Sequence, residues 1–333
     1  MPYQPRFAIT PECLKTLEKI QLLHARIQEA AKDLRWLPSL AKDIRARIAH
    51  SSTAIEGNPL NLKEVQTTLE GRPPGGASER SVQEIRNFAE VLRYLERLSG
   101  LSKIETRHVL NIHRILGEAN ALDRGPMGYY RNYGIQVGTH IGPTAAEVPG
   151  LMEELLEWLD GEGQKWPPVV SSAVLHFRFE WIHPFGDGNG RTGRALALLE
   201  LYRRRFDSHH IFAVDEIFWE RRPAYYAALR KVEQDPARDQ TSWIEFVAQA
   251  ILQALERTWK KIQSQRAGPG QKQIPLTPRQ EQLMKLLKKR PRRMAEIQKA
   301  LGVTRAGAHH ILKPLLKAKW VRHEGSSKTG VYR

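Results

Sequence analysis

The stretch that most constrains this chain of 333 residues runs from position 183 to position 194 and reads HPFGDGNGRTGR. Apolar residues recur at helical spacing on both sides of it. They are Val170, Val174, Phe177 and Trp181 before the stretch, and Ala195, Leu198, Leu199 and Tyr202 after it. The stretch is therefore predicted to be a loop between two amphipathic helices that pack in a core.

The residues of this loop favour an anionic ligand. Three alternating glycines, Gly186, Gly188 and Gly190, permit backbone angles that are closed to other residues. Consecutive N–H groups can then point into one concavity at the N-terminus of the second helix, where the helix dipole favours phosphate. Arg191 and Arg194 lie three residues apart and share a face of that helix, so their guanidinium groups are predicted to bind outer phosphates.

Two further side chains give the loop its chemistry. The imidazole of His183 titrates near neutrality, so it is suited to taking a proton from a hydroxyl at pH 7. The carboxylate of Asp187 is a hard oxygen ligand, and Mg²⁺ on a nucleotide is usually held by one or two carboxylates with phosphate oxygens and water. Phe185 is expected to pack inward and to hold the loop in shape.

This loop resembles the HPFxDGNGRxxR signature of Fic-domain proteins, and every specified position is filled here. The resemblance implies a mainly α fold with an all-helical catalytic core that transfers AMP from ATP to a protein hydroxyl and releases pyrophosphate. By the same resemblance, His183 is the general base and Asp187 the Mg²⁺ ligand. The implied ATP-binding residues are Gly188, Asn189 and Gly190 around the α-phosphate, and Arg191 and Arg194 on the β- and γ-phosphates. A P-loop is not expected, because no Gly-Lys-Ser/Thr follows the glycines.

A second motif lies upstream, where residues 52–58 read STAIEGN. They resemble the (S/T)xxxE(G/N) inhibitory motif of many Fic proteins, with Ser52, Glu56 and Gly57 at the specified positions. The segment is expected at a junction between two helices. The resemblance implies that Glu56 pairs with Arg194 and occupies the guanidinium that would otherwise hold the γ-phosphate.

The segment from Gly128 to Gly142 departs from helical periodicity, which predicts an extended hairpin. A β-hairpin flap stands at this place in the family that the chain resembles. A flap with an open strand edge can bind an extended segment of a target protein and present its hydroxyl to His183. Downstream, Tyr225-Tyr226 with Leu229 resembles a YYxxL element, which implies that Tyr226 lies beside the nucleobase, although such aromatic residues are usually core residues.

Helix signals elsewhere in the first part of the chain are local. Thr10 before Pro11 is a good helix start, and Asn61 with Glu64 forms a capping-box pattern. Helices are also predicted from Ser78 onward and over 105–116. His113, on the last of these, is expected to be a hydrogen-bonded core residue rather than a ligand.

The net charge of +16 is concentrated at one end of the chain. The segment 271–333 holds nine Lys and seven Arg against three Glu, a net charge of +13, so the rest of the chain holds only +3. This concentration favours contact with a polyanion. The single cysteine, Cys13, excludes an intramolecular disulfide, and no signal peptide or long apolar segment is present, so we expect a soluble, cytoplasmic protein without membrane contact.

The basic end resembles a winged helix-turn-helix. Thr277 caps a first helix, short helices follow at 295–301 and from Thr304, and 320–332 alternates around a glycine turn as a hairpin does. The last helix would turn Arg305, His309 and Lys313 toward a DNA major groove. The wing would bring Lys328 near phosphates. Winged helices also bind proteins, and Pro314 falls inside the proposed recognition helix.

Four parts are therefore predicted. They are an N-terminal helical region with the inhibitory motif (1–75), a Fic catalytic core (76–262), a linker rich in Gln, Gly and Pro (263–275) and a winged helix-turn-helix (276–333). The leading hypothesis is a Mg²⁺-dependent protein adenylyltransferase held off by Glu56. The alternatives are a DNA-binding transcriptional regulator with the Fic domain as a nucleotide sensor, and an enzyme that removes AMP from a modified protein. An intact His183 speaks against the sensor, and the oligomeric state stays open, with a homodimer as one candidate.

Overall fold

The structure is a computed structural model that describes residues 2–32, 34, 36–266, 277–317, 320–325 and 330–333. The chain divides into two compact units, Met1–Trp259 and Lys260–Arg333, and each is described by itself. The described residues are mainly helical, as predicted. None of the helices in these ranges is long and apolar enough to cross a membrane.

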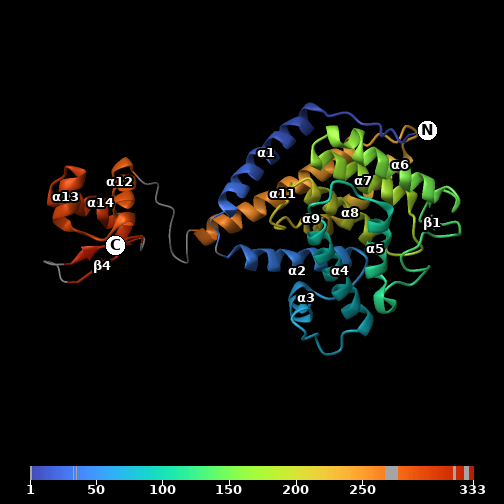
Figure 1. The fold of residues 1–333 in the computed structure, drawn as a ribbon, viewed down its shortest axis with the longest axis horizontal. Coiled ribbons are helices and arrows are strands. Elements are labelled where there is room, and N and C mark those ends of the chain that lie inside the picture. The colour runs from blue at the N-terminus through green and yellow to red at the C-terminus, as the bar shows by residue number, and fades with distance from the viewer. Residues whose placement is uncertain (1, 33, 35, 267–276, 318–319, 326–329) are drawn as a thin grey trace. The chain divides into compact units, whose positions relative to one another are not determined.

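The first unit is a set of packed helices with one small hairpin (Figure 1). Before the active loop the helices are α1 (Pro11–Ala31), α2 (Leu37–Ile55), α3 (Leu62–Leu69), α4 (Glu79–Arg97), α5 (Thr106–Leu116), α6 (Val148–Asp160) and α7 (Pro168–Ile182), with short 3-10 turns at Glu118–Asn120 and Glu162–Lys165. After it they are α8 (Asn189–Arg203), α9 (Val214–Glu220), α10 (Arg222–Gln234) and α11 (Thr241–Arg266). Helix α11 continues into the stretch predicted as a linker, and residues 267–275 of that stretch lie outside the described residues.

The predicted helix starts are confirmed by their capping hydrogen bonds. The Thr10 side chain accepts from the backbone N–H of Cys13 at 3.1 Å, with Pro11 in the first turn. At α3, Asn61 accepts from the Glu64 N–H at 3.1 Å and Glu64 accepts from the Asn61 N–H at 2.8 Å, which completes the capping box. These local bonds fix where the helices begin.

Helices α7 and α8 form the centre of the first unit. They pack against each other, with α6 on α7 and with α2, α4 and α5 on α8 (Figure 1). The sequence predicts an amphipathic α7, but this helix is buried on nearly all sides, including the polar residues Ser171 and His176. Both have buried partners, because Ser171 donates to Glu200 at 2.7 Å and His176 lies 3.1 Å from the Tyr225 hydroxyl. The active loop is thus carried by two fully enclosed helices.

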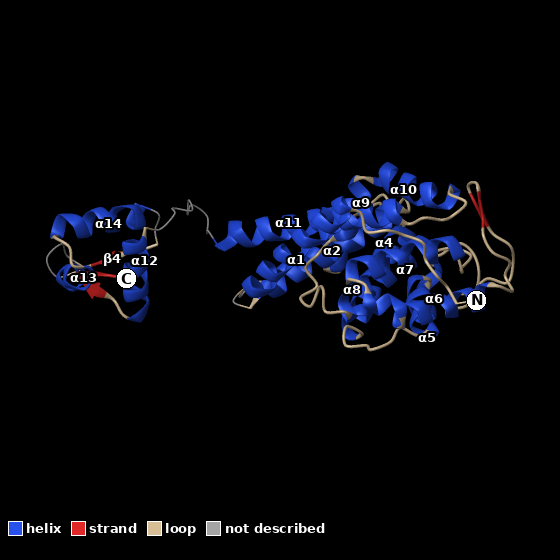
Figure 2. Ribbon diagram, turned by 90° about the horizontal axis from the view of Figure 1, so that it is seen from above, coloured by secondary structure: helices blue, strands red, loops and turns tan. Residues whose placement is uncertain are grey.

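The predicted hairpin is confirmed, but it is shorter than expected. Strands β1 (Gln136–Val137) and β2 (His140–Ile141) pair antiparallel, with Gln136 opposite Ile141 (Figure 2). The preceding residues 128–135 form turns and irregular backbone. Val137 and Ile141 are exposed, so the hairpin presents apolar side chains at the surface.

After the end of α11, the described residues of the second unit form the helices α12 to α14 and a small sheet. In chain order the elements are α12 (Pro278–Lys289), β3 (Arg292–Arg293), α13 (Met294–Leu301), α14 (Arg305–Lys317), β4 (His323–Glu324) and β5 (Val331–Tyr332). The sheet is antiparallel in the order β3-β5-β4. The core is apolar and includes Leu283, Ile297, Leu312 and Leu315. The helices and final hairpin follow the prediction, whereas β3 was not predicted, and Pro314 lies inside α14.

Candidate active site

Two residues with left-handed backbone angles bound the active loop. His183 ends α7 with φ 49° and ψ 61°, and Gly188 precedes α8 with φ 74° and ψ 10°. A glycine adopts such angles at no steric cost, whereas a histidine does so only where its surroundings hold it. The His183 side chain is therefore fixed at a sharp turn between the two central helices.

The other two glycines of the loop provide space rather than unusual backbone angles. A Cβ atom at Gly186 would run into the Tyr133 hydroxyl, and one at Gly190 would run into the Glu56 carboxylate. Of the three glycines, only Gly188 uses a positive φ. The prediction that all three serve backbone freedom is wrong for Gly186 and Gly190, which permit close approach by other segments.

Side chains inside the loop hold its shape. Asn189 donates to the Phe185 carbonyl and accepts from the Phe185 N–H, both at 2.9 Å. The Phe185 ring is fully buried, as predicted, and stacks on His113 with 3.7 Å between ring centroids. The side chain of Asn189 is thus committed to the loop, which leaves only its backbone N–H for an anion.

His113 is a hydrogen-bonded core residue, as predicted. Its Nδ1 accepts from the Gly128 N–H at 3.0 Å, so Nε2 carries the hydrogen and donates to the Asp187 carbonyl at 3.0 Å. Burial lowers the pKa of His113 to about 4, which keeps the ring neutral at pH 7. This histidine therefore holds the backbone of the loop in place at Asp187 through a hydrogen bond.

His183 is arranged as a base with one free nitrogen. Its Nδ1 lies 3.2 Å from the Glu180 carbonyl, and because a carbonyl can only accept, Nδ1 carries the hydrogen of the neutral ring. Nε2 is then the basic nitrogen. Burial lowers the pKa of His183 to about 4, so the ring is neutral at pH 7.

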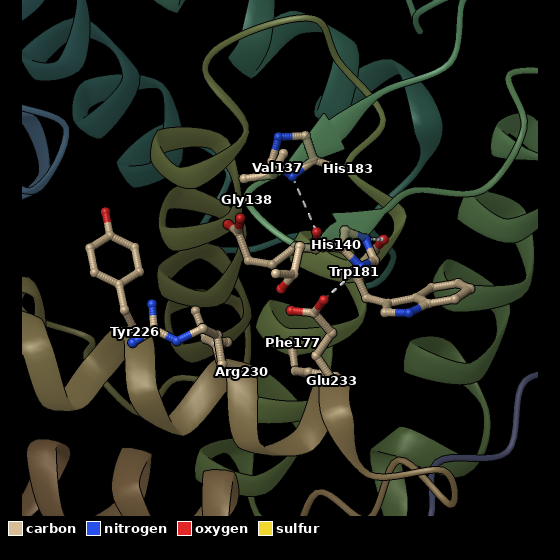
Figure 3. Close-up of a pocket in the computed structure, with 12 residues that line it drawn as sticks. Val137, Gly138, His140, Phe177, Trp181, His183, Tyr226, Arg230 and Glu233 are labelled. Atoms are coloured by element: carbon tan, nitrogen blue, oxygen red, sulfur yellow. Dashed lines mark hydrogen bonds and ion pairs between the residues drawn. The ribbon is translucent and has the colours of Figure 1, made fainter.

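His183 and Tyr226 line one pocket of about 230 Å³ (Figure 3). The hairpin, the end of α7 and the outer face of α10 enclose it, and its polar lining includes His140, Glu180, Arg230 and Glu233. His140 lies 2.8 Å from the Trp181 carbonyl and 3.1 Å from Glu233, so this side chain ties the hairpin to both helices. Burial raises the pKa of Glu180 to about 8.

The inhibitory segment reaches the loop through Arg194. The predicted pair is present, with Arg194 Nη2 at 2.8 Å from Glu56 Oε1. Nη2 also donates to the Ser52 carbonyl and Nε to the Ser52 hydroxyl, each at 2.8 Å. Burial by itself lowers the pKa of Arg194, but the Glu56 carboxylate raises it well above its usual range. Arg194 is therefore a charged, fully enclosed guanidinium bound to the inhibitory segment.

The position of this segment differs from the prediction in one respect. Helix α2 extends to Ile55, so Ser52 lies inside the helix and not at a junction. Only Glu56 and the residues after it leave the helix, and Gly57 has φ 99°, which suits a glycine at a helix end. Because α2 stays helical to this point, Ser52 and Glu56 stand one turn apart and face the same guanidinium.

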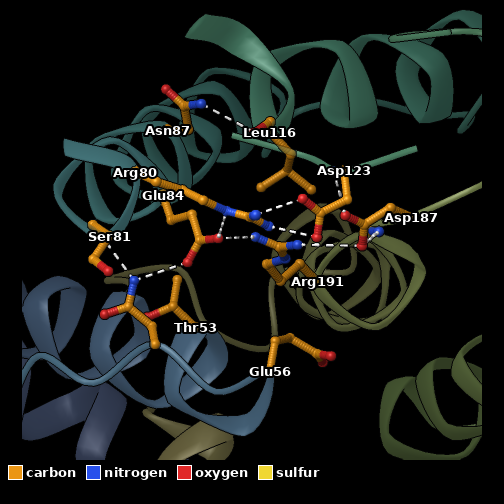
Figure 4. Close-up of polar contacts among 12 residues, drawn as sticks. Thr53, Glu56, Arg80, Ser81, Glu84, Asn87, Leu116, Asp123, Asp187 and Arg191 are labelled. Atoms are coloured by element: carbon orange, nitrogen blue, oxygen red, sulfur yellow. Dashed lines mark hydrogen bonds and ion pairs between the residues drawn. The ribbon is translucent and has the colours of Figure 1, made fainter. Parts of the chain in front are cut away.

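Arg191 and Asp187 belong to a closed ring of polar contacts among two guanidinium groups and three carboxylate residues (Figure 4). Arg191 lies 3.5 Å from Asp187 and 3.6 Å from Glu84. Glu84 lies 3.3 Å from Arg80, which also pairs with Asp123. The Asp123 N–H donates to Asp187 at 2.8 Å and closes the ring. The residues predicted to bind Mg²⁺ and phosphate thus orient each other.

Asn58 connects the inhibitory segment to this ring. Its side-chain amide donates to Glu84 at 2.8 Å and to the Ser81 carbonyl at 3.0 Å. Asn58 lies two residues after Glu56. The segment therefore contacts Arg194 of α8 directly, and it is linked to Arg191 of α8 through Glu84.

The donor set at Asp187 fits a Mg²⁺ ion shared with a nucleotide. Each carboxylate oxygen accepts one backbone N–H, from Asp123 or Gly188, and keeps a lone pair for a metal. Within the described residues, no group of three or more His, Cys, Asp or Glu side chains could hold a metal by itself. One carboxylate completed by phosphate oxygens and water is an arrangement typical of Mg²⁺.

Sequence reasoning missed several residues that support the site. Arg131 is buried and donates to the carbonyls of His183, Tyr133 and Pro143 at 2.8, 2.7 and 2.7 Å, which joins the base of the hairpin to the loop. Glu84, which lies beside Arg191, and Asp215, which lies beside Arg194, were also missed. Their residue types and spacing show no motif, so the sequence gives no sign that they meet the loop.

Comparison with known proteins agrees with this geometry. Residues 103–201 match the model of the Fic/DOC family, so the chain carries a Fic domain. It is 28% identical over 253 residues to "Protein adenylyltransferase fic-1" of Caenorhabditis briggsae, which covers 74% of this chain and 47% of that protein. It is 27% identical over 260 residues to "Protein adenylyltransferase Fic" of Drosophila virilis, which covers 74% and 50%. The chain thus spans about half the length of these curated relatives.

Solved structures show the same fold. A Fic family protein from Desulfovibrio desulfuricans G20 superposes with a TM-score of 0.69 at 28% identity, covering 99% of this chain and 98% of that one. A Fic domain containing signaling protein from Bacteroides thetaiotaomicron has a TM-score of 0.64 at 20% identity, covering 74% and 98%, and here the likeness concerns the fold alone.

Proposed function

We propose that this protein is a Mg²⁺-dependent adenylyltransferase that moves AMP from ATP to a hydroxyl side chain of a target protein. The observation that carries the proposal is the placement of His183. Its basic Nε2 belongs to a ring that lines the pocket, and the residue stands one short loop before the N-terminus of α8, where Arg191 and Arg194 lie. The relatives named as protein adenylyltransferases support the same reaction.

In the proposed reaction, His183 Nε2 takes the proton of the target hydroxyl as its oxygen attacks the α-phosphorus of ATP. The bond from that phosphorus to the oxygen that bridges to the β-phosphate breaks, and pyrophosphate leaves with the electron pair. Backbone N–H groups of Asn189 and Gly190 bind the α-phosphate, and Arg191 and Arg194 bind the outer phosphates. The Gly188 N–H, also predicted for the α-phosphate, donates to the Asp187 carboxylate instead. Mg²⁺ bound at Asp187 would supply further charge neutralisation for the departing pyrophosphate.

Two surfaces of the pocket are assigned to the remaining parts of the substrates. Tyr226 is assigned to the nucleobase, because it stands on α10 across the pocket from His183. The hairpin region, residues 128–142, is assigned to the target protein, because it offers exposed apolar residues and a two-residue strand beside the same pocket.

The ion pair between Glu56 and Arg194 defines the proposed resting state, in which transfer is blocked. While Glu56 holds Nη2, the γ-phosphate cannot use that nitrogen, so ATP binds without the geometry needed for transfer. We therefore propose that Ser52, Glu56 and Gly57 form an autoinhibitory segment. Removal of AMP from a modified protein is the alternative within the same enzyme class, with Glu56 placing a water.

We further propose that the second unit is a winged helix-turn-helix that binds DNA. Its order of helices and strands agrees with that fold, and α14 exposes Arg305, His309 and Lys313 at intervals of four residues. Lys328 lies outside the described residues. A regulator that only senses nucleotide would need no base, so His183 favours the enzyme. A cytoplasmic location and a homodimer stay predictions.

Labelled ATP tests the reaction class. With Glu56→Gly protein and Mg²⁺, ATP labelled at the α-phosphate is expected to give protein-bound label, and ATP labelled at the γ-phosphate none. His183→Ala in the same background is expected to remove the label. Transfer of the γ-label instead would indicate phosphorylation and would overturn the proposal.

A further inference from the structure

Arg194 has a second carboxylate partner, which contacts a different nitrogen of the guanidinium from Glu56. Asp215, in the first turn of α9, places Oδ2 at 3.8 Å from Arg194 Nε. The Asp215 side chain is 8% exposed, whereas that of Glu56 is 31% exposed. Ser52 links Arg194 to Asp215, since its hydroxyl accepts from Arg194 Nε at 2.8 Å and is a hydrogen-bond partner of Asp215.

The two carboxylates contact different nitrogens of the guanidinium. Glu56 binds Nη2, and Nη1 faces Gly190, where a Cβ atom would come within 3.1 Å of it. These two nitrogens therefore face the glycine-rich end of the loop, where phosphate is expected. Asp215 and the Ser52 hydroxyl contact Nε, which is a different nitrogen from the Nη2 that Glu56 binds and from the Nη1 beside Gly190.

The charge of Arg194 makes this second partner necessary. The residue is 2% exposed, and a buried guanidinium without a carboxylate is strongly unfavourable. When Glu56 leaves, Asp215 is the other carboxylate within 4.0 Å among the described residues. Burial raises the pKa of both Glu180 and Asp215, but at Asp215 the charge of Arg194 and the hydrogen bond with Ser52 oppose this rise.

We propose that Asp215 is the positioning residue of Arg194, which keeps the guanidinium in place when Glu56 departs and turns Nη1 and Nη2 toward the γ-phosphate. This inference rests on the proposed function and adds to it a residue outside both motifs. Asp215 touches no substrate. It acts by holding one edge of Arg194 through both states of the switch.

The relative affinity for ATP and ADP tests this role, because Arg194 is assigned to the phosphate that ADP lacks. In Glu56→Gly protein with Mg²⁺, calorimetry is expected to show tighter binding of ATP than of ADP. Adding Asp215→Asn is expected to weaken ATP binding about tenfold and to leave ADP binding within about twofold, since one charge-assisted contact is misplaced.

Asp207→Asn is the matched control in the same background. Asp207 is also fully buried in this unit, but it accepts from the backbone N–H groups of Ile211 and Phe212. It is expected to leave the ratio of ATP to ADP affinity unchanged. An unchanged ratio in folded Asp215→Asn protein would overturn the role of Asp215 alone, whereas Glu56→Gly protein that binds no ATP would overturn the proposed function together with it.

A variant that does not fold still decides the question. If Asp215→Asn unfolds because Arg194 is left uncompensated, the double variant Arg194→Ala, Asp215→Asn should be folded and should unfold at a higher temperature than the single variant. A double variant as unstable as the single one would show that Asp215 does not act through Arg194 and would overturn the proposal.

Discussion

Glu56 Oε1 lies 2.8 Å from Nη2 of Arg194, although the two residues are 138 positions apart in the chain. One stands at the end of α2 and the other in the second turn of α8. The contact gives the enclosed guanidinium a resting partner in the place where a phosphate would bind. Under the proposed function, nucleotide binding and inhibition therefore compete for the same nitrogen.

Gly190→Ala should destabilise the resting state selectively. The added Cβ runs into the Glu56 carboxylate, and such overpacking costs about 1–3 kcal/mol. In a Glu56→Gly background only Arg194 Nη1, 3.1 Å from the added Cβ, stays close, so the change should cost less. Urea unfolding of the four proteins measures the difference. Gly150→Ala in α6, where a Cβ meets no atom within 4 Å, should show no dependence on the background.

The pH dependence of transfer should follow the low pKa of His183. Burial lowers this pKa to about 4, so the basic form persists well below pH 6.5. The kcat/KM of Glu56→Gly protein should therefore be nearly constant between pH 7 and about pH 5 and fall toward pH 4. A tenfold loss between pH 6.5 and pH 5.5 would contradict this placement of His183.

Stability must be followed over the same range, because it also changes with pH. The pKa values of His113 and His183 are lowered to about 4 in the folded protein. Between about pH 4 and pH 6.5 the unfolded chain therefore binds more protons than the folded one, so the free energy of unfolding falls as the pH falls. Activity is to be compared only where circular dichroism shows folded protein.

Arg131→Lys should weaken the connection between the hairpin and the loop. Lysine cannot reproduce the fork of donors that serves the carbonyls of His183, Tyr133 and Pro143. We expect a loss of about 3 kcal/mol in the free energy of unfolding, since charge-assisted hydrogen bonds to buried carbonyls are lost. Arg114→Lys, at an exposed ion pair with Glu118, should change it by less than about 0.5 kcal/mol.

The 333-residue chain should bind duplex DNA in a salt-dependent way. Log affinity falls linearly with the logarithm of the salt concentration. Replacing Lys313 by Ala should make this fall less steep, by about 0.9 in the slope, if the side chain neutralises one phosphate. Lys299→Ala, exposed on α13 in the same unit, is the control and should leave the slope unchanged. Equal affinity at low and high salt would contradict DNA binding.

Local signals made much of the fold predictable. Caps such as Thr10 and Asn61 act within one helical turn, so their effect can be read from neighbouring residues. The loop was predictable because its whole chemistry lies in one short stretch. The burial pattern was less so, since α7, predicted to be amphipathic, is buried on nearly all sides.

The residues that support the site could not be predicted in the same way. Asp215, Glu84 and Arg131 meet the loop only because separate helices and the hairpin pack around it. In the sequence they are ordinary charged residues, which usually indicate a solvated surface. Their burial depends on contacts between distant segments, and the sequence pattern does not contain those contacts.

The central claim is that Glu56 restrains a transfer that depends on His183. Intact-mass spectrometry after incubation with ATP and Mg²⁺ tests it most directly, on wild-type protein, Glu56→Gly, and Glu56→Gly with His183→Ala. We predict that Glu56→Gly gains a covalent AMP, at least about tenfold more than wild type, because one charge-assisted bond at Arg194 is released. The double variant should gain none. Equal modification of wild type and Glu56→Gly, or modification without His183, would contradict the account.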